Sequence, residues 1–129
     1  EKYLDAARGA CPLRKVDAAK TILTELESPT TSMAVAVPHY TIMPNHWHAL
    51  LIPAANCELP LAEIMRRLKG RTARAINAAH GTSGPLWQRE WFDRWIRDDT
   101  EWERCVAYIR NNPVKAGLVT EWPQHPWTK

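Results

Sequence analysis

Two histidines one residue apart, His46 and His48, have the residue type and spacing for metal or acid–base chemistry. They follow a Pro-Asn pair at positions 44–45 that is flanked by two runs of β-forming residues, so positions 40–52 are predicted to form a β-hairpin. Because side chains alternate between the faces of a strand, His46 and His48 share one face while Trp47 points to the other. The two imidazoles either share a metal ion or form a half-exposed polar pair, with Trp47 anchored in the core.

A tyrosine and an asparagine four residues apart, Tyr108 and Asn112, form a second candidate pair. Asp98 and the glutamate three residues after it have the spacing of a capping box, which predicts a helix over 99–111 that Pro113 limits. If the last turn holds, Tyr108 and Asn112 lie together on one edge of that helix. Without other information, the residue pattern favours Tyr108 as a rim residue whose hydroxyl is in water over a catalytic tyrosine.

A third group of candidate residues is basic. Apolar residues at helical spacing predict a long amphipathic helix over 61–79, and Arg67, Arg71 and Arg74 align on another side of it. No acidic residue follows Glu63 in this helix, and positions 66–74 hold five cations that we expect to be uncompensated. Such a flank is either a solvated surface or a set of contacts to nucleic-acid phosphates.

The remaining elements must position these residues. Helical spacing predicts a first helix over 16–26, and positions 33–43 form the first hairpin strand, in which Pro38 implies a bulge or an unpaired amide. Pro53 closes the second strand. Pro60 suits the first position of the basic helix, because the amide that proline lacks would be unpaired there anyway.

Tryptophan-rich stretches flank the helix that carries Tyr108. Positions 86–96 are predicted to be a strand or extended arm whose aromatic side chains lie in the core or stack on unpaired bases. Positions 122–127 form a tail held by its tryptophans, and Gly117 caps a short turn after the helix. The buried stripe of the helix is predicted to contain Trp102, Cys105, Val106 and Ile109.

Length and composition favour one domain over residues 1–129, since 129 residues with 45% hydrophobic content hold a single core. The formal net charge of +3 permits an anionic partner without requiring one. Three cysteines without close pairing argue against a disulfide framework or a structural zinc site and favour a reducing cytoplasm. No apolar run approaches the ~18 residues of a membrane span, and the start does not resemble a signal peptide. We therefore expect no membrane partner.

Three motifs, in this order, resemble those of the REP-associated tyrosine transposases. This family belongs to the single-tyrosine HUH nucleases and is similar to the small insertion-sequence transposases that move as single strands. The motifs are Met43-Pro44-Asn45-His46-Trp47-His48, Gly84-Pro85-Leu86-Trp87-Gln88-Arg89 and Tyr108-Ile109-Arg110-Asn111-Asn112-Pro113-Val114-Lys115-Ala116-Gly117-Leu118. The resemblance covers roughly Leu13 to Trp127.

The resemblance implies an α+β fold with a ferredoxin-like or RRM-like antiparallel sheet and helices packed on it. In the family, a strand of the type Tyr-His-Val-Thr normally precedes the first helix, and no counterpart precedes Leu13. We therefore expect the first strand to be missing from this chain and the domain to be incomplete at its N-terminus. An edge of the sheet would then be exposed.

The resemblance also implies a metal-dependent endonuclease and strand transferase. It would act on single-stranded DNA with hairpins from palindromic repeats, through a 5′-phosphotyrosine intermediate. Tyr108 would be the nucleophile, and His46, His48 and Asn112 would hold Mg²⁺ or Mn²⁺. A phenol near its ordinary pKa of about 10 is a poor nucleophile, so the reaction needs a Lewis acid at the scissile phosphate. Arg67, Arg71 and Arg74 would contact the DNA backbone.

Two other functions stay open at this point. A non-catalytic nucleic-acid-binding domain would keep the fold and use His46, His48 and Tyr108 only structurally. A metal-dependent RNA-processing enzyme is the third possibility, because a 2′-hydroxyl nucleophile would need no tyrosine adduct. The family includes both dimers and chains able to act as monomers, so either a monomer or a homodimer is expected. The implied location is the bacterial cytoplasm, in association with the nucleoid.

Overall fold

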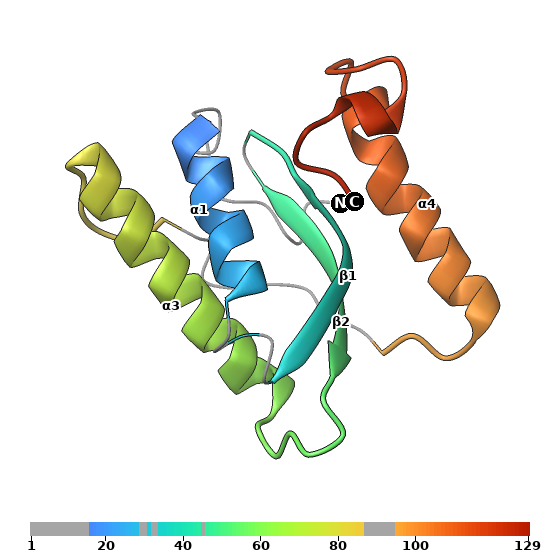
Figure 1. Cartoon of the computed structure of the whole chain (residues 1–129), viewed down its shortest axis with the longest axis horizontal. Coiled ribbons are helices and arrows are strands. Elements are labelled where there is room, and N and C mark those ends of the chain that lie inside the picture. Colours follow the sequence, from blue (N-terminus) through green and yellow to red (C-terminus); the bar gives the residue numbers. More distant parts are fainter. Residues whose placement is uncertain (1–15, 29–30, 32–33, 45, 87–94) are drawn as a thin grey trace.

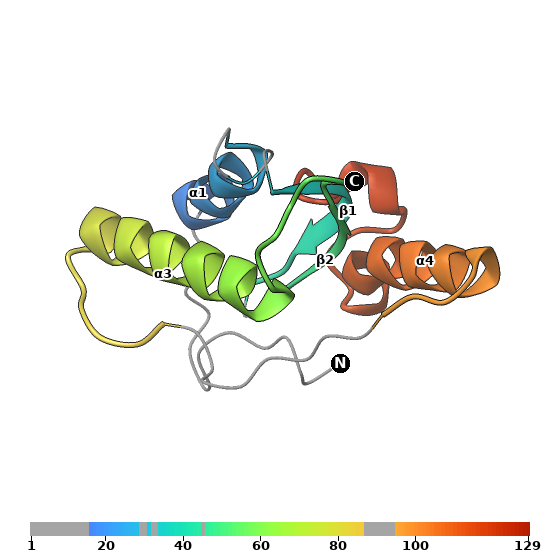
Figure 2. The ribbon, with the colours of Figure 1, turned by 90° about the horizontal axis from the view of Figure 1, so that it is seen from below.

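The computed structural model describes residues 16–28, 31, 34–44, 46–86 and 95–129. Helix α1 (Val16–Glu27) is followed by the strands β1 (Val35–Ile42) and β2 (Trp47–Pro53). Helices α3 (Leu61–His80) and α4 (Asp99–Lys115) and the short 3-10 helix η3 (Trp122–Gln124) complete the order. The strands form an antiparallel hairpin with α1 and α3 on one side and α4 on the other (Figures 1 and 2). The predicted α+β architecture is confirmed.

The β1–β2 hairpin has the predicted turn. Ile42 pairs with Trp47 and Thr41 with His48, and the turn is closed by the amide of Met43, which donates to the carbonyl of His46 at 2.7 Å. The register shifts between Ala36 and His39, where β1 has one more residue than β2. This is the bulge predicted at Pro38, whose ring nitrogen has no hydrogen to donate to the ladder.

The C-terminal segment lies along the edge of β1 that β2 leaves open. The amide of Ile42 donates to the carbonyl of Trp127 at 2.9 Å, and the amide of Lys129 donates to the carbonyl of Tyr40 at 2.9 Å. Thr41 and Thr128 form the bridge between these two bonds. The exposed edge that we expected is therefore covered on β1 between Tyr40 and Ile42.

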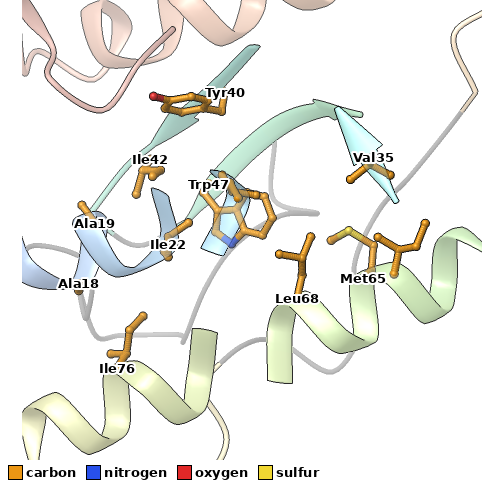
Figure 3. Close-up of a cluster of buried hydrophobic side chains, with 12 residues drawn as sticks. Ala18, Ala19, Ile22, Val35, Tyr40, Ile42, Trp47, Met65, Leu68 and Ile76 are labelled. Carbon is orange, nitrogen blue, oxygen red and sulfur yellow. The ribbon is translucent and has the colours of Figure 1, made fainter. Parts of the chain in front are cut away.

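The hydrophobic core fills the space between the hairpin and the helices α1 and α3 (Figure 3). Both helices bury the central part of the predicted apolar stripes, although Ala79 at the end of α3 is exposed, and both end within a residue of the predicted bounds. The buried cluster consists of Ala18, Ala19, Ile22, Leu26, Val35, Tyr40, Ile42, Trp47, Ile64, Met65, Leu68 and Ile76. Pro60 is the N-cap of α3, with extended φ and ψ of −61° and 149°, and not its first helical residue as predicted.

Helix α4 is longer than predicted, because it runs through Pro113 to Lys115. Proline removes one internal hydrogen bond, but Pro113 lies in the last turn and is buried, so the helix continues for two residues. Gly117, with φ of 76°, then ends α4 itself, whereas the prediction was that it caps a separate short turn after the helix. Its amide donates to the carbonyl of Val114, and the amide of Leu118 donates to that of Pro113, which is the Schellman pattern.

The start of α4 is capped almost as predicted. The carboxylate of Asp98 accepts from the amide of Glu101 at 2.8 Å, but Glu101 reaches back to the amide of Arg97, one residue earlier than a capping box requires. Of the stripe predicted to be buried, only Ile109 is, and the other three residues are partly exposed. The physical reason is that α4 packs on a narrow two-stranded hairpin, which covers only part of its surface.

Most of the tryptophan-rich arm falls on residues 87–94, outside the described part of the chain. Leu86, just before it, packs against the core, whereas Trp95, just after it, is 74% exposed.

Cys57 and Cys105 are both free thiols. Within the described residues, we find no helix that is long and apolar enough to span a bilayer.

Candidate active site

The two histidines lie side by side at the start of β2. The ring centroids of His46 and His48 are 4.8 Å apart, with the planes inclined at 77°. Trp47, between them in sequence, is buried in the core with α1 and α3. The predicted alternation is therefore confirmed, and it separates a core face of the hairpin from a face that carries the histidines.

Helix α4 brings Tyr108 to that second face. The Tyr108 ring meets the His48 ring edge-on, with centroids 5.3 Å apart and an interplanar angle of 80°. His48 is only 6% exposed, whereas Tyr108 is 37% exposed, so the tyrosine closes one side of a site that remains open to solvent. Residues that lie 60 positions apart in the sequence thus form one cluster.

Asn112 follows Tyr108 by one helical turn. Helix α4 continues past this residue, and side chains at positions i and i+4 of a helix are neighbours, about 6 Å apart at Cβ. Asn112 is partly buried, in keeping with a position on the edge of α4. The sequence prediction required the helix to continue through Asn112, and α4 does so.

The donor set suits a weak, open metal site. His46 and His48 offer two nitrogen ligands on one face, and a side-chain amide such as that of Asn112 offers an oxygen ligand. No group of three His, Cys, Asp or Glu residues that could hold a metal occurs among the described residues. Two imidazoles and one amide oxygen would fill three positions of a six-coordinate cation and leave the others for phosphate oxygens and water.

The three arginines lie away from this cluster, because α3 and α4 are on opposite sides of the hairpin (Figure 1). The expectation that the five cations at positions 66–74 are uncompensated is wrong for Arg66, Arg67 and Arg71. Glu63 accepts from Arg66 at 2.8 Å and from Arg67 at 2.8 Å, and these guanidinium groups lower the pKa of Glu63 to about 2. The acid lies three and four residues before the arginines, at the helix start.

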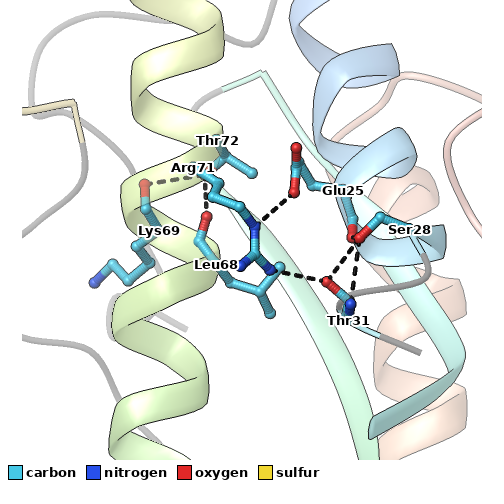
Figure 4. Close-up of polar contacts among 7 residues, drawn as sticks. All are labelled: Glu25, Ser28, Thr31, Leu68, Lys69, Arg71 and Thr72. Atoms are coloured by element: carbon cyan, nitrogen blue, oxygen red, sulfur yellow. Dashed lines mark hydrogen bonds and ion pairs between the residues drawn. The ribbon is translucent and has the colours of Figure 1, made fainter. Parts of the chain in front are cut away.

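Arg71 is held between α3 and α1 (Figure 4). Its Nε donates to Glu25 Oε2 at 2.9 Å, and its Nη2 donates to Thr31 Oγ1 at 3.1 Å. Arg74 is exposed and makes no ion pair with the described residues. Because Glu25 belongs to another helix, the charge pattern of α3 alone did not predict this pair.

Sequence reasoning also missed a polar chain beside the site. Thr41, the cross-strand partner of His48, lies 2.8 Å from Thr128 through their hydroxyl oxygens, and His125 Nδ1 lies 2.6 Å from the same Thr128 oxygen. His125 is 8% exposed, and its burial lowers the pKa of the imidazole. Sequence gave no local signal for this chain, since it joins residues 87 positions apart.

The sequence matches the family model of IS200-like transposases over residues 13–112. This range includes both histidines of the site, Tyr108 and Asn112. The chain belongs to the IS200-like transposase family. The resemblance predicted from the three motifs is therefore confirmed, and this IS200-like chain has an α+β domain of the expected kind.

Two relatives define the likeness further. The solved structure of a REP-associated tyrosine transposase bound to a REP hairpin superposes with a TM-score of 0.71 at 19% identity, and the match covers 97% of this chain and 72% of that one. The two proteins share a fold. An uncharacterised protein of Haemophilus influenzae is 29% identical to this IS200-like chain over 62% of it. The matched region is 55% of that curated relative, so the chain corresponds to just over half of its length.

Proposed function

We propose that this chain is a metal-dependent endonuclease and strand transferase for single-stranded DNA that carries hairpins. The observation that supports this most is the packing of Tyr108 against His48, with His46 beside it. A nucleophile hydroxyl and two potential metal ligands then lie on one open face. Membership of the IS200-like transposases supports the reaction class, and the fold shared with a hairpin-bound transposase supports the substrate.

In this proposal, Tyr108 Oη attacks the phosphorus of a backbone phosphodiester. A new P–O bond joins the phenol oxygen to phosphorus, and the bond from phosphorus to the 3′ oxygen breaks. The phenol proton leaves to solvent, to which 37% of Tyr108 is exposed, and the departing 3′ oxygen takes a proton to become a hydroxyl. The phosphotyrosyl bond retains the free energy of the broken bond, so a 3′-hydroxyl can later reverse the reaction and rejoin the strands.

His46, His48 and Asn112 would hold a divalent cation, Mg²⁺ or Mn²⁺, beside Tyr108. When bound, the cation supplies Lewis-acid polarisation of the phosphate and stabilises negative charge on the leaving oxygen. The β1–β2 register holds the backbone of His48, the hydrogen bond from the Met43 amide holds that of His46, and α4 holds that of Asn112. We further propose that Arg67 and Arg74 contact phosphates of the hairpin, whereas Arg71 serves the α1–α3 interface.

The test is a denaturing gel of the protein with labelled, hairpin-bearing single-stranded DNA and Mn²⁺. A slow, protease-sensitive band is expected for the unmodified chain and should be lost without metal. Tyr108→Phe should lose this band completely while binding to the DNA, measured by fluorescence anisotropy, stays within about twofold. Tyr40→Phe is the matched control, since Tyr40 is a buried tyrosine in the core cluster, and it should keep the band.

Each alternative function has its own outcome in this experiment. DNA binding without a covalent band in any variant would contradict the nuclease proposal and favour a non-catalytic binding domain. Cleavage that requires a ribose 2′-hydroxyl and survives Tyr108→Phe would favour RNA processing instead.

A further inference from the structure

A groove of about 700 Å³ lies on the side of α4 away from Tyr108, between this helix, β1 and η3. Arg110, which lines it, is two residues after Tyr108, and two residues correspond to roughly 200° around an α-helix. The groove and the nucleophile therefore lie on opposite flanks of the same helix. The lining residues are His39, Trp102, Glu103, Val106, Ala107, Arg110, Asn111, Val114 and Trp122.

Aromatic rings from three separate elements form the walls of this groove. Trp102 of α4 meets the His39 ring of β1 edge-on, with centroids 6.0 Å apart. The indole of Trp122 in η3 lies under the guanidinium of Arg110, whose central carbon is 4.3 Å from the ring centroid. Planar surfaces of this kind stack on nucleobases, because every base has a π-face and guanidinium planes stack as well.

The polar groups in the groove distinguish a base from other ligands. Arg110 Nε is buried and has no hydrogen-bond partner among the described residues. A ligand in the groove would reach this donor only after a shift of the Arg110 side chain, and the resulting hydrogen bond would then favour that shift. Glu103 and Asn111 are exposed at the groove and can pair with the edge of a base. The carboxylate of Glu103 would repel a phosphate, whereas it would accept hydrogen bonds from exocyclic amino groups.

We propose that this groove binds one unpaired nucleobase of the DNA strand on which Tyr108 acts. The inference rests on the proposed function and names a part of its substrate. A volume of about 700 Å³ is within the range of small-molecule pockets, roughly 300–1,000 Å³, and admits one base with its sugar. Since α4 carries both Tyr108 and the groove, a base held here fixes the position of the scissile phosphate along the strand. The groove would thus help to select the cleavage site.

The test combines substrate and protein changes in one binding experiment. Hairpin DNA with single-stranded flanks is prepared with one abasic site at each flanking position in turn, and affinity for the full chain is measured by anisotropy without divalent metal. One flanking position should weaken binding about tenfold when its base is absent. Trp102→Leu and Arg110→Gln should each weaken binding to intact DNA and remove most of the penalty at that one position.

Trp95→Leu is the matched control, because Trp95 is 74% exposed and does not line the groove. It should keep the full abasic penalty. Circular dichroism and thermal melting of each variant identify any variant that fails to fold. Trp102 and Arg110 lie eight residues apart on α4, so the two variants change separate parts of the groove wall.

Several results would overturn this inference. Tyr108-dependent cleavage with no position-specific abasic penalty, or with a penalty that both groove variants keep, would leave the proposed function standing and refute the groove. A change of molar mass in solution caused by Trp102→Leu, without a change of the penalty, would assign the groove to a second copy of the chain. If no hairpin DNA is bound or cleaved, both proposals fail.

Discussion

At the scale of single residues, one ring contact and one helical spacing connect helix α4 to the histidines of the hairpin and to Asn112. The contact joins His48 to Tyr108, and the spacing joins Tyr108 to Asn112. The first would orient the proposed nucleophile, since the buried imidazole gives the phenol ring a fixed surface to pack on. The second concerns metal binding and leads to a quantitative prediction.

Asn112→Ala is expected to weaken the metal site and leave the fold intact. Loss of one ligand should raise the Mn²⁺ concentration for half-maximal cleavage by about tenfold or more. Asn112→Asp should restore or lower that concentration, because a carboxylate is a stronger oxygen ligand for a hard cation than an amide. A metal titration of the cleavage rate measures both effects, and an unchanged titration in Asn112→Ala would exclude Asn112 as a ligand.

The sequence predicted which residues lie together at the site, but it did not predict which arginines of α3 are paired with acids. His46, His48 and Tyr108 were found because strand alternation and the motifs are local in the chain, and the structure brings them together. The ion pair of Arg71 with Glu25 was missed, because a partner 46 residues away has no fixed spacing. The structure tests the proximity of these residues only, so the ligand roles of His46, His48 and Asn112 and the nucleophile role of Tyr108 remain predictions.

At the scale of elements, α1 and α3 are joined by both apolar packing and a polar bridge. Arg71 and Glu25 have side chains that are 26% and 24% exposed, so their pair is less screened than a surface ion pair. Thr31 adds a second acceptor for the same guanidinium. Two neighbouring arginines of α3, Arg71 and Arg74, should therefore have different roles.

Arg71→Gln is expected to lower the free energy of unfolding by about 1–2 kcal/mol, because it leaves the Glu25 carboxylate and the Thr31 hydroxyl with one partner fewer. Arg74→Gln should change it by less than about 0.5 kcal/mol. In DNA binding the order should reverse, with Arg74→Gln lowering the salt dependence by about one counterion. Urea denaturation and binding at several salt concentrations measure the two effects. An equal loss of salt dependence in Arg71→Gln would show that Arg71 also contacts the DNA.

The bounds of the elements were predictable where local chemistry decides them. Apolar spacing gave α1 and α3, the bulge followed from Pro38, and the cap at Asp98 followed from hydrogen-bond spacing. The end of α4 was not predictable from local sequence. Pro113 lies in the last turn, and the burial of its ring offsets the cost of a proline there. That burial depends on tertiary packing.

At the scale of the whole molecule, the C-terminal segment connects the outer edge of β1 with the site. His125 contacts Thr128, and Thr128 contacts Thr41, which pairs with His48. Sequence analysis placed this segment only as a tail held by tryptophans. Its pairing with β1 was not predictable, because three residues are too few for a period-2 pattern.

The buried imidazole of His125 should make stability depend on pH. Its pKa is lowered in the folded state because burial disfavours the charged form, whereas in the unfolded chain it is near 6.5. On acidification the unfolded chain therefore takes up the proton first. Stability should be constant with respect to this group above about pH 7 and fall as pH drops through 6.5 towards the folded-state pKa.

The slope from one proton is at most about 1.4 kcal/mol per pH unit. Chemical denaturation between pH 8 and pH 5 measures it, and His125→Asn should show a shallower dependence over the same range. Equal slopes in the two proteins would mean that other groups cause the acid sensitivity.

The bulge in β1 bears on how the length of this chain can vary. Ala36 pairs with Ile52 and His39 with Leu50, so β1 has two residues where β2 has one. Loss of a single codon at position 37 or 38 would turn the bulge into a regular ladder and leave both flanking pairs unchanged. Loss of a codon between His39 and Ile42 would instead exchange the two faces of the strand. Within β1, natural length variants should therefore be found at the bulge.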